Sequence, residues 1–220
     1  VDMAPTILPR EDSDVVAELA AQFEREGIAV CADHKVLGFG ADDGSYTLSA
    51  EHAGKTVQLP FDHVLVAIGR KPNTEGLGLE ALGIELTPQG TIAVDDYLRT
   101  SIPAIYACGD VAGPYQFTHM ASHQAWYAAV NTLFGGLRKF KVDYSVVPWA
   151  TFTDPEVARV GLSEKEAAEQ SIEVGVTCYA LGDHDRALAD GDASGFVKVL
   201  TAPGSDRILG AVIVGAHAGE

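Results

Sequence analysis

Cysteine is scarce in this sequence. Its 220 residues include three cysteines, Cys31, Cys108 and Cys178, and no two of them lie close together in the chain. Neither a zinc site of paired cysteines nor a disulfide framework is therefore expected, and nothing indicates an oxidising compartment. We expect a cytoplasmic protein. His119 and His123 have the spacing of a helical metal pair, but no third ligand follows at a clear spacing, so no metal is assigned.

Positive charge and long apolar runs are also lacking. The chain has 15 Lys and Arg against 31 Asp and Glu, which gives a formal net charge of -16. Such an acidic surface repels phosphate backbones and anionic lipids, so neither nucleic acid nor a membrane is an expected partner. No apolar run approaches the roughly 20 residues that a membrane span needs, and no signal peptide opens the chain.

The first two thirds of the chain alternate helical and strand-like patterns. Apolar spacing predicts a helix over residues 12–26, which Asp12 or Ser13 can cap and Gly27 can end. A second helix is expected over residues 121–134, with Gly135 and Gly136 as its stop. Strands are expected over residues 28–31, 46–51, 56–59, 64–68, 91–94 and 104–108, and turns at Gly38, Gly40, Gly44 and Gly54.

The last third has a different pattern. A short helix is expected over residues 163–170, and residues 201–207 are expected to join two strands as a hairpin. The strands are expected over residues 147–152, 178–181, 196–200 and 208–214. Together they predict an α+β unit on an antiparallel sheet, which follows an α/β part. The acidic stretch over residues 183–192 is interpreted as a solvated loop, and Trp126, Tyr127 and Phe134 as core residues. Trp149 is placed under a dimer surface.

The first chemical motif ends in Gly109-Asp110. Residues 100–110 read TSIPAIYACGD, an apolar strand that ends in a turn ahead of a helix. Gly109 lets a ligand approach the backbone closely, and Asp110 can accept hydrogen bonds from sugar or ribityl hydroxyls. The free N–H groups of the helix that follows suit an anionic or polar ligand edge. A Gly-Asp pair on its own is more often a plain turn.

The second motif lies earlier in the chain, where another apolar segment ends. Residues 63–73 read HVLVAIGRKPN, a buried strand followed by Gly69, Arg70 and a Pro-Asn turn. Gly69 would let the chain pass close to a nucleotide, and Arg70 could hold a carboxylate or phosphate. This pattern is also common on its own, so the order and spacing of the two motifs together carry the specificity.

With both motifs in place, the sequence resembles the flavin-dependent pyridine nucleotide–disulfide oxidoreductases, a family that includes dihydrolipoamide dehydrogenase and mercuric reductase. Residues 67–73 match the A-x-G-R-x-P-N segment at the exit of the family's NAD(P) domain, and residues 104–110 match its FAD-contacting G-D segment. The resemblance covers essentially the whole chain. It also includes residues 1–12, 148–162, 186–189, 195–199 and 208–211.

The resemblance implies three parts and two cofactors. Residues 1–73 would be the second half of an NAD(P)-binding domain, residues 74–145 the returning part of an FAD-binding domain, and residues 146–220 a homodimerisation domain. Electrons would pass from NAD(P)H through FAD to a disulfide centre and a small-molecule acceptor. NAD is favoured over NADP. The implied cofactor-binding residues are Gly109, Asp110, Thr118, His119, Met120 and Ala121 for FAD, and Asp2, Ile68, Gly69 and Arg70 around NAD(P) and FAD.

Several family motifs have no counterpart here. The redox C-x4-C pair, both G-x-G-x-x-G phosphate loops and the C-terminal His–Glu pair are absent. We expect the chain to be truncated at both ends, with no catalytic residue of its own. The alternatives are a related NADH oxidase or transhydrogenase without the disulfide, and a non-catalytic dimerisation module. The acceptor, whether lipoamide, a glutathione-like disulfide or Hg(II), stays open.

Overall fold

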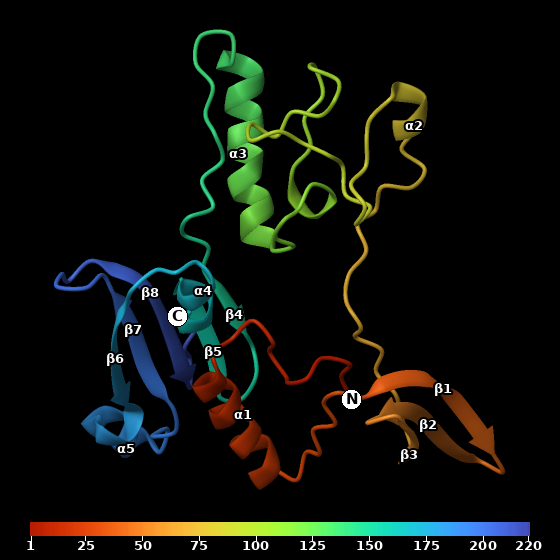
Figure 1. Ribbon diagram of the computed structural model, residues 1–220, viewed down its shortest axis with the longest axis vertical. Coiled ribbons are helices and arrows are strands. Elements are labelled where there is room, and N and C mark those ends of the chain that lie inside the picture. The colour runs from red at the N-terminus through yellow and green to blue at the C-terminus, as the bar shows by residue number, and fades with distance from the viewer. The chain divides into compact units, whose positions relative to one another are not determined.

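The computed structural model describes residues 1–220 as two compact units. The first unit combines residues 1–65 with residues 146–220, and the second unit consists of residues 66–145 (Figure 1). Each unit has its own hydrophobic cluster of buried side chains. None of the helices is both long and apolar enough to cross a bilayer.

An antiparallel sheet of five strands dominates the first unit. Its strand order is β4-β5-β8-β7-β6. The strands are β4 Trp149–Thr151, β5 Glu156–Gly161, β6 Gly175–Ala180, β7 Phe196–Thr201 and β8 Ile208–Gly215. Two short helices, α4 Glu164–Glu169 and α5 Asp185–Asp190, connect them, together with the 3-10 turn η2 Leu181–Asp183.

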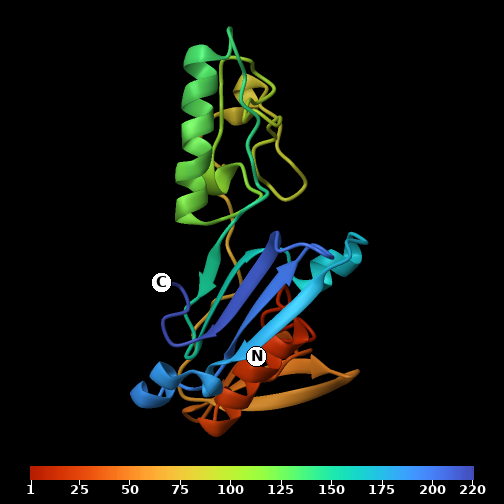
Figure 2. The same cartoon turned by 90° about the vertical axis from the view of Figure 1, so that its left-hand side faces the viewer.

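Helix α1, Ser13–Arg25, lies beside this sheet in both views (Figures 1 and 2). Its Val15 packs in one buried cluster with Val157, Val212 and Val214, which come from β5 and β8. Because side chains alternate across a strand, the same sheet face also carries Arg159 and Lys198. The first helix of the chain therefore belongs to the core of the sheet unit, although all five strands of that sheet come from the last third of the sequence.

The opposite face of the sheet is apolar but only half-buried. Its apolar members on the three central strands are Ala158, Val160, Val197, Val199, Ala211 and Ile213. An antiparallel sheet with one solvated face normally carries polar residues there. An apolar face of this kind is typical of a surface that another layer of protein covers.

The first unit also holds a separate three-stranded meander, β1 Lys35–Asp42, β2 Ser45–His52 and β3 Lys55–Phe61. Gly44 and Gly54, at the two turns, have φ angles of 82° and 74°, as turn glycines require. The expected turns at Gly38 and Gly40 were wrong, because both glycines lie inside β1 and pair with β2.

The second unit is built from one long helix and irregular chain. Helix α3 spans Thr118–Phe134, α2 is a single turn at Leu79–Leu82, and the 3-10 turn η1 spans Gly109–Val111. Ile84, Ile92 and Ala107 form its buried cluster. The chain between these elements makes isolated bridges, Leu86 with Ile92 and Arg99 with Tyr106, and no ladder.

Several expected elements differ from the structure. The apolar segments 28–31, 64–68, 91–94 and 104–108 are not strands, because no other segment of the chain forms a ladder of hydrogen bonds with them. The acidic stretch is not a plain loop: Asp185–Asp190 forms α5, stabilised by an Arg186–Asp190 pair one turn apart. Trp126 and Phe134 are not core residues, being 54% and 58% exposed.

Candidate functional site

Asp110 lies in a tight turn whose geometry requires the glycine before it. Gly109 opens the 3-10 turn η1 with a φ of 76°, in the left-handed region. A Cβ at this position would lie 3.1 Å from the Cβ of Ala121 on α3, which is closer than side chains normally pack. Gly109 therefore serves both the backbone conformation and the close approach of helix α3 to the turn.

The two sequence motifs meet at Asp110. The Arg70 guanidinium donates from Nη2 to Oδ2 of Asp110 at 2.5 Å and from Nη1 to the carbonyl oxygen of Gln116 at 3.2 Å. The Arg70 side chain is 64% exposed and that of Asp110 35% exposed, so both remain accessible to a ligand. The structure thus brings Gly69-Arg70 and Gly109-Asp110 together at one surface site, although the motifs are about 40 residues apart in sequence.

Helix α3 begins earlier than residue 121, the start expected from sequence. Its first residue is Thr118, Phe117 is the N-cap, and the N–H of Ala121 already donates to the carbonyl of Phe117. His119 stacks on the Phe117 ring at a centroid distance of 5.4 Å, and Met120 is buried in the unit. The N–H groups of the first helical residues, ahead of Ala121, lack intrahelical acceptors and can face a polar ligand. The side chain of Met120 is instead packed in the core.

The other predicted site residues are dispersed. Asp2 lies in the first unit, where its Oδ1 accepts from the N–H of Ala4 at 2.8 Å and its own N–H donates to the carbonyl of Cys31. Ile68 is 93% exposed, and Gly69 beside it has a φ of 120°. The structure therefore brings Arg70 to Asp110 within the second unit, whereas Asp2 belongs to the first unit.

Two residues of the site were not predicted from sequence. Gln124 on α3 is fully buried, accepts at Oε1 from the N–H of Gly109 at 2.6 Å, and donates from Nε2 to the carbonyl of Gly113 at 2.6 Å. The same Nε2 donates to the hydroxyl of Tyr144 at 2.8 Å. Burial raises the pKa of Tyr144 above its usual value, and the hydrogen bond from Gln124 opposes part of that rise. No sequence signal identified Gln124, because the buried face of α3 carries a second polar residue, Asn131, as well.

A hollow of about 590 Å³ opens in the same unit. It is lined by Arg70, Asp95, Asp96, Gln116, Lys141 and Tyr144, among others. Its charged groups are already paired: Arg70 with Asp110, Lys141 with Asp96, and Arg99 with Asp95. The hollow therefore has no unpaired charge that would select a charged ligand, and no ligand is assigned to it.

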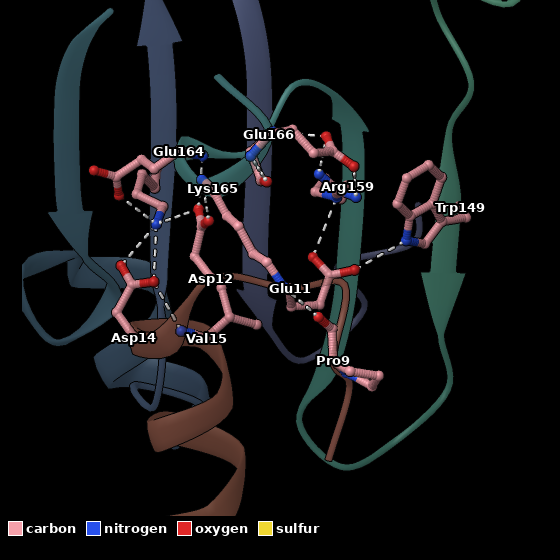
Figure 3. Close-up of polar contacts among 12 residues, drawn as sticks. Pro9, Glu11, Asp12, Asp14, Val15, Trp149, Arg159, Glu164, Lys165 and Glu166 are labelled. Atoms are coloured by element: carbon pink, nitrogen blue, oxygen red, sulfur yellow. Dashed lines mark hydrogen bonds and ion pairs between the residues drawn. The ribbon is translucent and has the colours of Figure 1, made fainter. Parts of the chain in front are cut away.

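A second cluster of charged side chains, which we term the ionic joint, lies between α1 and the five-stranded sheet (Figure 3). It comprises Glu11, Asp12, Asp14, Arg159, Glu164, Glu166 and Lys198. The almost fully buried Lys198 ammonium lies 2.8 Å from Asp12, Asp14 and Glu164. Oxygen atoms of these three carboxylates lie within 4.8 Å of one another, as in a metal site, but Lys198 already supplies the cation there.

Asp12 shows how the joint works. It is the N-cap residue of α1, yet its carboxylate caps a different helix: it accepts from the N–H groups of Glu164 and Lys165 at the start of α4. Burial alone would raise the pKa of Asp12, but the hydrogen bonds from Lys198 and these N–H groups hold it below its ordinary value. The Lys198 pKa is raised because the bonds to its carboxylates outweigh the effect of burial.

Arg159 forms the other half of the joint. Its guanidinium donates to both oxygens of Glu166, at 2.7 and 3.0 Å, and lies 3.2 Å from Glu11. The Trp149 ring lies against the Arg159 guanidinium at 4.2 Å, and the Trp149 indole N–H donates to Glu11. Burial would raise the pKa of Glu166, but the bonds from Arg159 lower it overall.

Comparison with known proteins places the chain in one class, the pyridine nucleotide-dependent oxidoreductases. Residues 1–125 match the family model described as pyridine nucleotide-disulphide oxidoreductase, and residues 147–220 match its dimerisation domain. The chain belongs to the pyridine nucleotide-disulphide oxidoreductase family. The resemblance inferred from the two motifs is therefore confirmed.

Relatives and solved structures agree with this assignment. The chain is 36% identical over 220 residues to dihydrolipoyl dehydrogenase of Mycobacterium tuberculosis, covering 100% of this chain and 47% of that protein. It is 37% identical over 215 residues to mercuric reductase of Acidithiobacillus ferrooxidans, covering 98% and 38%. The Cu(II) complex of the HOCl-induced flavoprotein disulfide reductase RclA from Escherichia coli matches with a TM-score of 0.88 at 29% identity, covering 100% and 50%. The chain thus spans about half or less of these proteins.

Proposed function

We propose that this chain supplies the flavin-ribityl contact, the NAD(P)-side segment and the dimerisation surface of an FAD-dependent oxidoreductase. The observation that carries the proposal is the meeting of Arg70 and Asp110, which brings the two family motifs to one accessible site. The reaction proposed is electron transfer from NAD(P)H through FAD to a disulfide centre and a small-molecule acceptor. These 220 residues contain no cysteine pair that could be that centre.

The residues at the site fit a flavin. Asp110 presents a carboxylate that can accept hydrogen bonds from ribityl hydroxyls, and Gly109 lets helix α3 approach the turn closely beside it. The N–H groups of Thr118 and His119, in the first turn of α3, can face a polar edge of the ring system. FAD, when bound, supplies the hydride and electron chemistry, while these groups bind and orient it.

We further propose the division of the chain into residues 1–73 of an NAD(P)-binding domain, residues 74–145 of an FAD-binding domain and residues 146–220 of a dimerisation domain. The family matches over residues 1–125 and 147–220 support the last boundary. NAD is preferred to NADP because Asp2 offers an exposed carboxylate, which accepts from a free ribose 2′-hydroxyl and repels a 2′-phosphate. A clear preference for NADPH in kcat/KM would contradict this.

A homodimer through residues 146–220 completes the proposal, with the cytoplasm as its location. The half-buried apolar face that includes Val160, Val199 and Ile213 supports it, because a two-fold partner can cover such a face. An obligate interface of this kind buries roughly 2,000 Å² or more. Analytical ultracentrifugation of the protein expressed from its complete reading frame tests it, and a monomer at micromolar concentrations would overturn it.

The decisive experiment measures flavin on the protein expressed from its complete reading frame. Asp110→Ala is expected to lower flavin affinity by about 1–3 kcal/mol, because ribityl hydroxyls lose their acceptor. Asp96→Ala is the matched control, since Asp96 is an exposed carboxylate of the same unit that pairs with Lys141. An unchanged flavin-to-protein ratio in Asp110→Ala would reject the assignment. The 220-residue chain alone should retain little FAD, because it has no G-x-G-x-x-G phosphate loop.

A further inference from the structure

Gln124 connects helix α3 to both ends of the turn that carries Asp110. Its Oε1 accepts from the N–H of Gly109, one residue before Asp110, and its Nε2 donates to the carbonyl of Gly113, three residues after it. The second Nε2 hydrogen is directed to the hydroxyl of Tyr144. The network satisfies the side-chain amide completely and thereby fixes which way it points.

Apart from Gln124, the turn is held by backbone bonds and by packing: the N–H of Ile92 donates to the carbonyl of Val111 at 2.7 Å, and Val111 and Ala112 pack against the buried cluster. Within the turn, the N–H groups of Ala112 and Gly113 both donate to the carbonyl of Gly109, which closes η1 on itself. The Asp110 side chain is 35% exposed and bonds to the largely exposed Arg70. The direction of the carboxylate therefore depends on how firmly the backbone of residues 109–113 is held, and Gln124 is the buried side chain that holds it at both ends.

We propose that Gln124 is a positioning residue for the Asp110 carboxylate, which sets flavin affinity without touching the flavin. The inference rests on the proposed function, because it gives Gln124 a role in the same site. A ligand-binding group that is held in place before binding loses less conformational entropy when the ligand arrives. Loss of the Gln124 amide should therefore weaken flavin binding by more than its effect on the fold explains.

The chain provides a matched control on the same helix. Asn131 lies two turns after Gln124, is also buried, and makes an equivalent set of bonds: it donates to the carbonyls of Tyr97 and Phe140 and accepts from the N–H of Phe140. Neither partner belongs to the Asp110 turn. Replacing Asn131 removes a buried amide of similar weight from the same unit but leaves the turn intact.

The experiment compares Gln124→Met with Asn131→Leu in the protein expressed from its complete reading frame. Each variant keeps the approximate side-chain volume and removes the amide. Both are expected to lower the melting temperature of the flavin-free protein. Only Gln124→Met should raise the dissociation constant for FAD, on the order of 10-fold, because it leaves the N–H of Gly109 and the carbonyl of Gly113 without their partner. The visible circular dichroism of bound flavin should change in the same variant only.

The outcomes separate the inference from the function on which it rests. If Asp110→Ala loses flavin but Gln124→Met binds it like the unmodified protein, the positioning role is overturned and the flavin site stands. If Asn131→Leu weakens flavin binding as much as Gln124→Met, general destabilisation explains the effect and the inference also fails. If Asp110→Ala retains flavin, the proposed function itself is rejected.

If the Gln124→Met protein does not fold, a second variant, Gln124→Glu, tests the positioning role. Gln124→Glu keeps an acceptor for the N–H of Gly109 but places a carboxylate oxygen against the carbonyl of Gly113. An intermediate loss of flavin affinity is expected from this variant, with the same change in circular dichroism. Unchanged affinity in Gln124→Glu would overturn the proposal, since it would show that pinning the turn at Gly113 is not needed.

Discussion

The two polar networks of this chain hold a helix in place by opposite means. In the first unit, the ionic joint binds α1 to the sheet through buried charges, with Lys198 among three carboxylates and Arg159 between two. In the second unit, the neutral amide of Gln124 binds α3 to the Asp110 turn. The charged network depends on pH and on every partner being present, whereas the neutral network depends on neither charge nor pH.

The difference agrees with where each network lies. The ionic joint belongs to the first unit and includes none of the candidate flavin-site residues. In the proposed function, the Asp110 turn presents its carboxylate to a ligand, and a buried charge beside it would alter how strongly that carboxylate attracts the ligand. A neutral amide fixes the turn without that cost. The predictions below test this comparison, from the largest expected effect to the smallest.

Lys198→Met should produce the largest change. It leaves the buried Asp12 carboxylate without its cation beside Asp14 and Glu164, which should destabilise the first unit by about 3 kcal/mol. Urea denaturation measures the loss, and hydrogen exchange should place it in α1 and β7. Lys141→Met is the control, since Lys141 forms an exposed pair with Asp96 and its loss should be undetectable. Equal effects of the two substitutions would show that burial of the joint contributes nothing.

The next largest effect is expected from acid, which should weaken the ionic joint. Asp12 and Glu166 have pKa values below their ordinary 3.8 and 4.5, so their contribution is complete above those values and is lost as the pH falls through the lower, folded-state values. Each unit of pKa depression corresponds to about 1.4 kcal/mol. Urea midpoints from neutral pH down to about pH 3 should therefore fall, and fall less in Lys198→Met. Hydrogen exchange that opens the Asp110 turn before α1 would contradict this.

Gly109→Ala tests the second unit at its tightest contact. An alanine in the left-handed region costs roughly 1–2 kcal/mol, and here its methyl would also press on Ala121 at 3.1 Å. Gly76→Ala carries the backbone cost alone, because Gly76 has a φ of 75° and open space around its Cβ position. The difference between the two variants therefore isolates the contact with Ala121. Thermal unfolding should rank Gly109→Ala below Gly76→Ala. The same stability for both variants would mean that the approach of α3 to the turn is not tight.

Sequence reasoning was most successful where a pattern is local. The helix over residues 12–26, the hairpin of β7 and β8 and the short helix near residue 164 were predicted because apolar spacing, capping residues and turn residues all act within a few positions. The 3-10 turn at Gly109-Asp110 was indicated by the same kind of signal. This turn pointed to a particular family only when the second motif was considered together with it.

Sequence reasoning was least successful where the cause is distant in the chain. Residues 64–68 have the composition of a buried strand, but no segment of this chain pairs with them, so their apolar pattern could not decide their structure. The ionic joint connects Asp12 to Lys198, and no periodicity relates two residues so far apart. Asp12 was predicted as a cap of its own helix, whereas its carboxylate caps α4. Gln124 went unnoticed because a single glutamine on a helix has no sequence signature.

The smallest effect, and the finest test of the comparison, is expected from Tyr144→Phe. The substitution removes the hydroxyl that accepts from Nε2 of Gln124 at 2.8 Å but leaves both bonds to the Asp110 turn in place. One buried N–H then lacks a partner, which should cost about 1 kcal/mol in the free energy of unfolding. Flavin affinity should change little, because the turn stays pinned at Gly109 and Gly113.

Tyr115→Phe is the control for this substitution, since the Tyr115 ring packs against Tyr144 at 5.8 Å without bonding to Gln124. Thermal unfolding and flavin titration of both variants provide the comparison. A loss of flavin affinity in Tyr144→Phe as large as in Gln124→Met would mean that the Asp110 turn is held through Tyr144 and not through the backbone bonds of Gln124. The neutral network would then act as a chain of side chains, as the ionic joint does, and the contrast between the two units would lose its physical basis.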